Sequence, residues 1–160
     1  MCKCKYTDDK LHHECGVFGI YGVEDAAGLA YYGLHALQHR GQQGCGIVSV
    51  GPDGGFHRVK GEGLVTEVFN EDRISKLPGK MAIGHVRYSN AGCKGTENLQ
   101  PFLFHHNSGD FALANNGQIV NYRQLREDLE DRGSLFQSSS DAEILAHLIK
   151  KQGIDKDQPR

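Results

Sequence analysis

Glu14-Cys15-Gly16-Val17-Phe18-Gly19-Ile20 places a cysteine directly in front of a short apolar run that glycines interrupt. We predict a buried strand from Val17 to Tyr21. If the residues before it are removed, Cys15 carries both a nucleophile and a base, because its own α-amine can accept the thiol proton. The two reference pKa values are close, roughly 8.5 for the thiol and about 8 for the amine, so this transfer needs no histidine.

The composition of the 160-residue chain predicts one globular domain with a substantial core. A net charge of −2 argues against a nucleic-acid partner, and no apolar run approaches the length that spans a membrane. Residues 1–14 lack the apolar core of a secretory signal, so we expect a cytoplasmic protein with reduced cysteines. Cys2 and Cys4 stand near His12 and His13 without a second ligand pair, so no metal site is predicted.

Hydrophobic periodicity and turn residues predict a mixture of strands and helices. After the first strand, the expected strands are 46–50, 56–60, 81–88 and 111–114, and the first two of these form a hairpin. The expected helices are 24–39, short pieces within 64–76, 121–132, and a last helix from Ser140 to Lys151. Gly41 is expected to end the first helix in a left-handed conformation, and Gly133 to end the helix at 121–132. Ser140 and Glu143 are expected to form a capping box.

Several polar residues fall where predicted strands end or helices begin. Arg87 offers a planar fork suited to an α-carboxylate, and Asp141 a carboxylate suited to an α-ammonium. The Asn116 side chain and the Gly117 backbone N–H are donors of the kind that form an oxyanion hole. Each also has a structural interpretation: a surface ion pair for Arg87, a turn for Asn116-Gly117 and a helix cap for Asp141. Their joint occurrence favours a site for a zwitterionic amide substrate.

Six motifs in unbroken order carry a resemblance that extends from Glu14 to Lys151. They are Glu14–Ile20, Tyr32–Gln42, Ile83–Tyr88, Glu97–Pro101, Asn116–Asn121 and Ser139–Glu143. Together they resemble the glutaminase domain of the amidophosphoribosyltransferase family, a group of class II (N-terminal nucleophile) glutamine amidotransferases. Tyr88 and the sequence Gln38-His39-Arg40-Gly41-Gln42 favour this family over the related sugar synthases.

The resemblance implies a role for each candidate residue. Cys15 matches the nucleophile that removal of a propeptide exposes, and its sulfur would attack the glutamine side chain to give a thioester and ammonia. Asn116 and Gly117 match the oxyanion-hole pair. Arg87 matches the ligand of the α-carboxylate, and Asp141 the ligand of the α-amine.

Further positions match the surroundings of the nucleophile, and two depart from the family. Arg40 and Gly41 match residues placed around the nucleophile and the bound substrate, and Tyr88 is expected to contact the substrate. Asn90 stands where the family usually has threonine, and Cys45 stands where it usually has alanine. A small buried thiol is a tolerable replacement for alanine.

The resemblance also implies the fold and the domain organisation. The fold is α+β, the αββα sandwich of N-terminal nucleophile hydrolases with two mostly antiparallel sheets, and it is expected to be incomplete here. Residues 1–14 are expected to be a propeptide and residues 15–160 a truncated glutaminase domain without the phosphoribosyltransferase domain. That missing domain would bind phosphoribosylpyrophosphate with magnesium and, in some members, an iron–sulfur cluster. No cofactor is expected in this chain, whose small-molecule partner is glutamine; full-length members are expected to form homo-oligomers.

Two alternatives to the glutaminase of phosphoribosylamine synthesis remain open at this point. The chain could be a non-catalytic truncated fragment that persists as a glutamine-binding module. It could also be a glutaminase subunit for a different acceptor enzyme.

Overall fold

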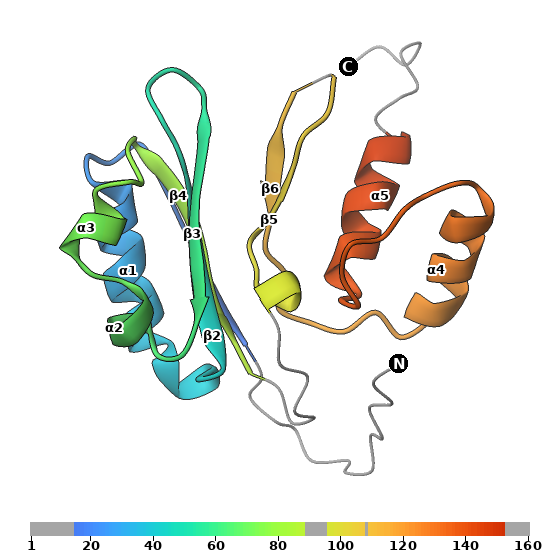
Figure 1. Cartoon of the computed structure of the whole chain (residues 1–160), viewed down its shortest axis with the longest axis horizontal. Coiled ribbons are helices and arrows are strands. Elements are labelled where there is room, and N and C mark those ends of the chain that lie inside the picture. The colour runs from blue at the N-terminus through green and yellow to red at the C-terminus, as the bar shows by residue number, and fades with distance from the viewer. Residues whose placement is uncertain (1–14, 89–95, 108, 153–160) are drawn as a thin grey trace. The chain divides into compact units, whose positions relative to one another are not determined.

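The computed structural model describes residues 15–88, 96–107 and 109–152 (Figure 1). The described residues form two compact units, which divide between Asn116 and Gly117. None of the described helices is long and apolar enough to span a membrane. We describe each unit by itself.

The first unit is built on a four-stranded antiparallel sheet in the order β1-β4-β2-β3. Its strands are β1 (Gly16–Tyr21), β2 (Gly44–Val50), β3 (Phe56–Glu62) and β4 (Met81–Arg87). The predicted hairpin is confirmed as β2 and β3, although each strand extends two residues beyond the predicted range at the open end of the hairpin. The strand predicted at 81–88 is confirmed as β4.

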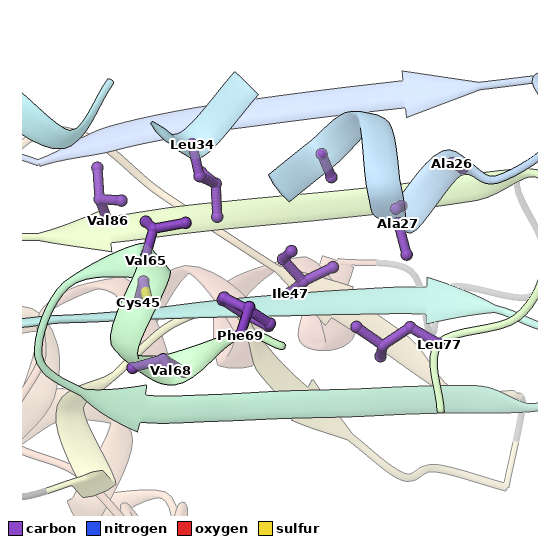
Figure 2. Packing of buried hydrophobic residues seen from close by; sticks show 12 residues of the cluster. Ala26, Ala27, Leu34, Cys45, Ile47, Val65, Val68, Phe69, Leu77 and Val86 are labelled. Carbon is purple, nitrogen blue, oxygen red and sulfur yellow. The ribbon is translucent and has the colours of Figure 1, made fainter. Parts of the chain in front are cut away.

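Helices cover one face of this sheet (Figure 1): α1 (Ala26–Ala36), α2 (Val65–Val68) and α3 (Glu71–Ile74). Asp25 caps α1 by accepting a hydrogen bond from the backbone N–H of Gly28 at 3.2 Å. Figure 2 shows the core between the two layers, where Leu34 of α1 lies among side chains that alternate along the strands. These side chains include Cys45 and Ile47 of β2 and Val86 of β4. Alternation along β2 and β4 therefore directs one set of residues toward the helices.

The other face of β2 is also buried, because residues near Gln100 pack directly on it. Val48 is only 2% exposed. A Cβ atom at Gly46 would lie 2.4 Å from the carbonyl oxygen of Gln100, which leaves no room for any side chain there. The absence of a side chain at Gly46 therefore lets two backbones meet.

Two predictions about this unit are wrong. Among the described strands, β1 pairs only with β4, so it is the edge strand of this sheet rather than a buried strand; Val17 is 38% exposed and Tyr21 81% exposed. α1 ends at Ala36 and is followed by a 3₁₀ turn at Gln38–Arg40. Gly41 then has an extended backbone with φ of −165°, not the left-handed conformation.

A second, two-stranded antiparallel sheet consists of β5 (Phe102–Phe104) and β6 (Phe111–Leu113). β6 confirms the strand predicted at 111–114, whereas β5 was not predicted from the sequence. Phe104 stacks on Phe111 across this pair, with ring centroids 5.1 Å apart. β5 contains only three residues, too few for a recognisable alternation in the sequence. The aromatic contact with β6 stabilises the pairing of the two strands.

The second unit contains α4 (Tyr122–Asp131) and α5 (Ala142–Gln152). Both helices were predicted, and Gly133, with φ of 84°, follows the end of α4. The predicted capping box is wrong, because the carboxylate of Glu143 accepts hydrogen bonds from the backbone N–H groups of Gln137 and Ser138. The backbone N–H of Ser140 donates instead to the hydroxyl of Ser138.

The contact between Gly46 and Gln100 predicts a strong difference between two glycine substitutions. We expect Gly46→Ala to lower the free energy of unfolding by about 1–3 kcal/mol, because the new methyl group collides with a backbone atom. Gly19→Ala in β1 is the matched control, since its Cβ would lie 3.8 Å from Ile83, an ordinary contact. Urea unfolding of both variants measures the difference, and equal stability of the two would contradict this packing.

Candidate functional site

Cys15 lies directly before β1 and is held by residues from two other segments. Its Sγ donates a weak hydrogen bond to the carbonyl oxygen of Tyr88 at 3.9 Å. The Nε of Arg40 donates to the carbonyl oxygen of Cys15 at 2.7 Å. Cys15 has φ of 59°, in the left-handed region, and its side chain is half-buried. The end of β4 and the turn after α1 thus fix the backbone and the thiol of this residue.

Gly41 brings that turn against the end of β4. A Cβ atom at Gly41 would lie 2.6 Å from the carbonyl carbon of Arg87, so only glycine permits this approach. The backbone N–H of Gln43 donates to the carbonyl oxygen of Arg87 at 3.0 Å. The side chain of Gln38 donates to the carbonyl oxygen of Gly41 and accepts from the backbone N–H of Val65. The structure therefore brings together five of the predicted site residues, namely Cys15, Arg40, Gly41, Arg87 and Tyr88.

The guanidinium of Arg87 contains an unsatisfied donor. Its Nη1 is buried and has no hydrogen-bond partner among the described residues. A buried donor without an acceptor costs about 1–3 kcal/mol, and more when it is charged. A carboxylate is the group whose geometry matches a guanidinium fork. The site can therefore bind an anionic group at Arg87.

His85 is a residue of this site that the sequence interpretation did not include. It precedes Arg87 by two positions in β4, so both lie on the sheet face away from the helices. It is 1% exposed, its cross-strand neighbours are Val17 and Gly46, and neither ring nitrogen has a partner among the described residues. The i, i+2 spacing in the sequence is the signal that could have found it.

The pKa of His85 is lowered from 6.5 to about 4; burial is the largest cause, and the positive charge of Arg87 is the next. His85 is therefore neutral near pH 7. Arg87 thus carries the positive charge at this end of β4.

The remaining predicted residues lie at or beyond the boundary of the two units. Asn116 is the last residue of the first unit and is exposed. Gly117 opens the second unit with φ of 155°. Asp141 lies just before α5, and its Oδ2 accepts from the backbone N–H of Ile119 at 2.7 Å. Asp141 is thereby tied to the segment that begins with Gly117, and the catalytic roles of these three residues stay predictions.

Cys45 is buried in the core and is not disulfide-bonded. Burial raises the pKa of its thiol to about 12, so it remains protonated and unreactive. Asn90, the other departure from the family pattern, lies outside the described residues, as do Cys2, Cys4 and the predicted propeptide. Within the described ranges, no group of three His, Cys, Asp or Glu side chains could hold a metal ion.

Comparisons with known proteins found a matching family model and similar sequences. A family model described as a glutamine amidotransferase domain matches residues 71–158. The chain is 58% identical over 144 residues to an amidophosphoribosyltransferase of Bacillus subtilis, which covers 89% of the chain but 30% of the relative. It is 52% identical to the amidophosphoribosyltransferase of Lacticaseibacillus casei, covering 89% of the chain and 73% of that relative.

Two solved structures are similar to the chain. The first, described as the allosteric regulatory enzyme of purine biosynthesis, has a TM-score of 0.81 and 56% identity over 86% of this chain and 30% of its own. The second is a glutamine phosphoribosylpyrophosphate amidotransferase from B. subtilis complexed with ADP and GMP, with a TM-score of 0.79 and 55% identity over 86% of this chain and 29% of its own. These similarities confirm the predicted fold class, an α+β N-terminal nucleophile hydrolase fold with antiparallel sheets.

The buried, neutral His85 predicts a dependence of stability on pH. The folded chain binds this proton near pH 4, whereas an unfolded histidine binds it near pH 6.5. Between these values the unfolded state holds more protons, so the free energy of unfolding falls as the pH drops through this range, by up to about 3 kcal/mol. In urea unfolding at pH 7 and pH 4.5, His85→Gln should lose less stability on acidification than the wild type. An equal loss in both proteins would show that His85 does not titrate in this way.

Proposed function

Since the chain belongs to the glutamine amidotransferase family, and within it to the amidophosphoribosyltransferases, we propose that it hydrolyses glutamine to glutamate and ammonia with Cys15 as the nucleophile. The observation that carries this proposal is the buried Nη1 of Arg87, which has no partner among the described residues and lies at the strand end whose next residue accepts a hydrogen bond from the Cys15 thiol. A substrate carboxylate at Arg87 would satisfy this donor. Cys15 would then face the rest of the same substrate molecule.

The chemistry requires Cys15 to be the first residue of the mature chain, so we propose that residues 1–14 are a propeptide. The freed α-amine takes the thiol proton, and Sγ attacks the side-chain amide carbon of glutamine to form a tetrahedral oxyanion. The amine returns the proton to the nitrogen, which leaves as ammonia while a γ-glutamyl thioester remains. Water then cleaves the thioester, releasing glutamate and restoring the thiol.

The other predicted residues divide the remaining tasks. Arg87 binds the α-carboxylate of glutamine, and Asp141 binds the α-ammonium. The side chain of Asn116 and the backbone N–H of Gly117 donate hydrogen bonds to the oxyanion, where they stabilise the transition state more than the ground state.

Around the nucleophile, Arg40 holds the Cys15 carbonyl, which keeps the thiol oriented. Gly41 admits the backbone of Arg87, and Tyr88 supplies a carbonyl oxygen to the thiol. We assign these three residues to the walls of the substrate site. None of them needs to exchange a proton during the reaction.

In the longer relatives, the ammonia released by this domain is proposed to be used in a second reaction. The chain spans 30% of the length of the B. subtilis relative. We propose that the ammonia converts phosphoribosylpyrophosphate to phosphoribosylamine, the first committed step of purine biosynthesis, in a region of the relatives that this sequence does not span. We propose that magnesium and any iron–sulfur cluster bind in that same region of the relatives. We also propose that the whole enzyme is cytoplasmic and forms a homo-oligomer.

Covalent labelling tests the nucleophile directly. We expect the purified protein to have an intact mass that begins at Cys15 and to gain one adduct from a γ-diazoketone analogue of glutamine. Cys15→Ser should abolish the adduct, because the thiolate is the attacking group. Cys45→Ala should label like the wild type, since the Cys45 thiol is buried and protonated.

Three outcomes distinguish the proposal from its alternatives. A mass that begins at Met1 or Cys2, with no adduct and no glutamate release, would refute the activity for this chain. Glutamine binding without release would indicate a glutamine-binding module. Adduct formation that persists in Cys15→Ser would assign the reaction to another cysteine.

Steady-state kinetics test how the roles are divided. We expect Arg87→Ala and Asp141→Ala to raise KM for glutamine, since each removes one ionic contact that exists before the reaction. Asn116→Ala should lower kcat by roughly 100-fold, because the oxyanion exists only in the reaction. Arg58→Ala, which removes an exposed arginine of β3, is the control for charge alone. Equal losses in kcat and KM across the three site variants would contradict these assignments.

A further inference from the structure

The motif Glu97–Pro101 belongs to the family pattern, yet the proposed reaction gives it no role. In the structure the segment is buried from Asn98 onward: Leu99 is 1% exposed, Asn98 6% and Gln100 7%. Lys60 of β3 holds it, because its Nζ donates to the carbonyl oxygens of Thr96 at 2.6 Å and Leu99 at 3.3 Å. The segment is therefore fixed to the sheet before the chain continues into β5.

The side chain of Gln100 leaves this segment and reaches the residue before Asn116. Its Oε1 accepts a hydrogen bond from the backbone N–H of Asn115 at 2.6 Å. The backbone of Gln100 is itself held, because its carbonyl oxygen lies on Gly46 with no space for a Cβ. A buried side chain on a fixed backbone has little freedom, so the position of the Asn115 peptide follows from the position of β2.

We propose that Gln100 is a positioning residue that holds the side chain of Asn116 at the oxyanion, acting through its hydrogen bond to the Asn115 backbone. The inference deepens the proposed function and rests on it. Oxyanion donors act at about 2.7–3.1 Å, and a displacement of about 1 Å can reduce the rate by roughly 100-fold. Asn116 is exposed and lies where one unit ends, so the fixed peptide before it is the anchor that limits its movement.

The test compares variants of Gln100 in the processed protein. Gln100→Leu keeps the approximate volume and removes the acceptor, so we expect kcat to fall about 10- to 100-fold while KM for glutamine changes less than about threefold. Gln100→Glu retains an oxygen acceptor for the Asn115 N–H but introduces an acidic group, so it should recover only part of the lost kcat. Labelling by the γ-diazoketone analogue should slow in parallel with kcat, whereas alkylation of Cys15 by iodoacetamide, which needs no oxyanion hole, should not change.

Lys60→Met is the matched control, because it removes two hydrogen bonds to the same segment without touching Asn115. It should lower stability, but it should lower kcat much less than Gln100→Leu does, because the backbone of Gln100 is still held against Gly46. An equal fall of kcat in Lys60→Met, an unchanged kcat in Gln100→Leu, or a parallel loss of iodoacetamide reactivity would overturn the proposal.

Hydrogen exchange of the wild type keeps the proposal testable if a Gln100 variant fails to fold. The backbone N–H of Asn115 should exchange as slowly as the amides of β4, and rapid exchange would overturn the proposal. Release of glutamate by the wild type is measured first. Its absence would refute the proposed function itself, and this inference with it, whereas release combined with a neutral Gln100→Leu would refute only the role of Gln100.

Discussion

Close packing of main-chain atoms against β2 and β4 is the constraint on which the first unit depends. Gly41 lies against the backbone of Arg87, and Gly46 lies against the carbonyl of Gln100, each at a distance that excludes a Cβ atom. These contacts bring one loop to the end of β4 and another to the face of β2. Since backbone positions vary less than side-chain positions, groups attached to these loops are placed with little freedom.

The polar groups of the site depend on this packing for their energetics. Arg87 and His85 share one face of β4, yet only Arg87 is charged near neutral pH. A second positive charge would make each of them more costly to bury. The Nη1 of Arg87, which has no partner among the described residues, carries a free-energy cost that the proposed substrate carboxylate would remove. Because the backbone around Arg87 is held by close packing, binding there would require little further ordering.

Local sequence signals predicted the elements whose determinants are local. The hairpin of β2 and β3, the strand β4 and the helix before Gly133 follow from alternation, turn residues and periodicity. The conformation of Gly41 was predicted wrongly. Glycine is needed there because the backbone of Arg87, which lies far along the chain, leaves no space for a side chain. The chemical pattern indicated Cys15 and Arg87, whereas the hydrogen bond between Gln100 and Asn115 leaves no periodic pattern in the sequence and is seen only in the three-dimensional structure.

The strand order has a consequence for when the nucleophile is assembled during folding. Within the part of the chain that the structure describes, β1 pairs with β4 alone, and the contact between Cys15 and Tyr88 spans 73 residues, whereas β2 and β3 form a local hairpin. Closing a long loop costs more entropy than closing a hairpin, so β1 is expected to add to the sheet after its other strands have paired. Nascent chains would therefore carry Cys15 outside its site until β4 has been synthesised and has docked.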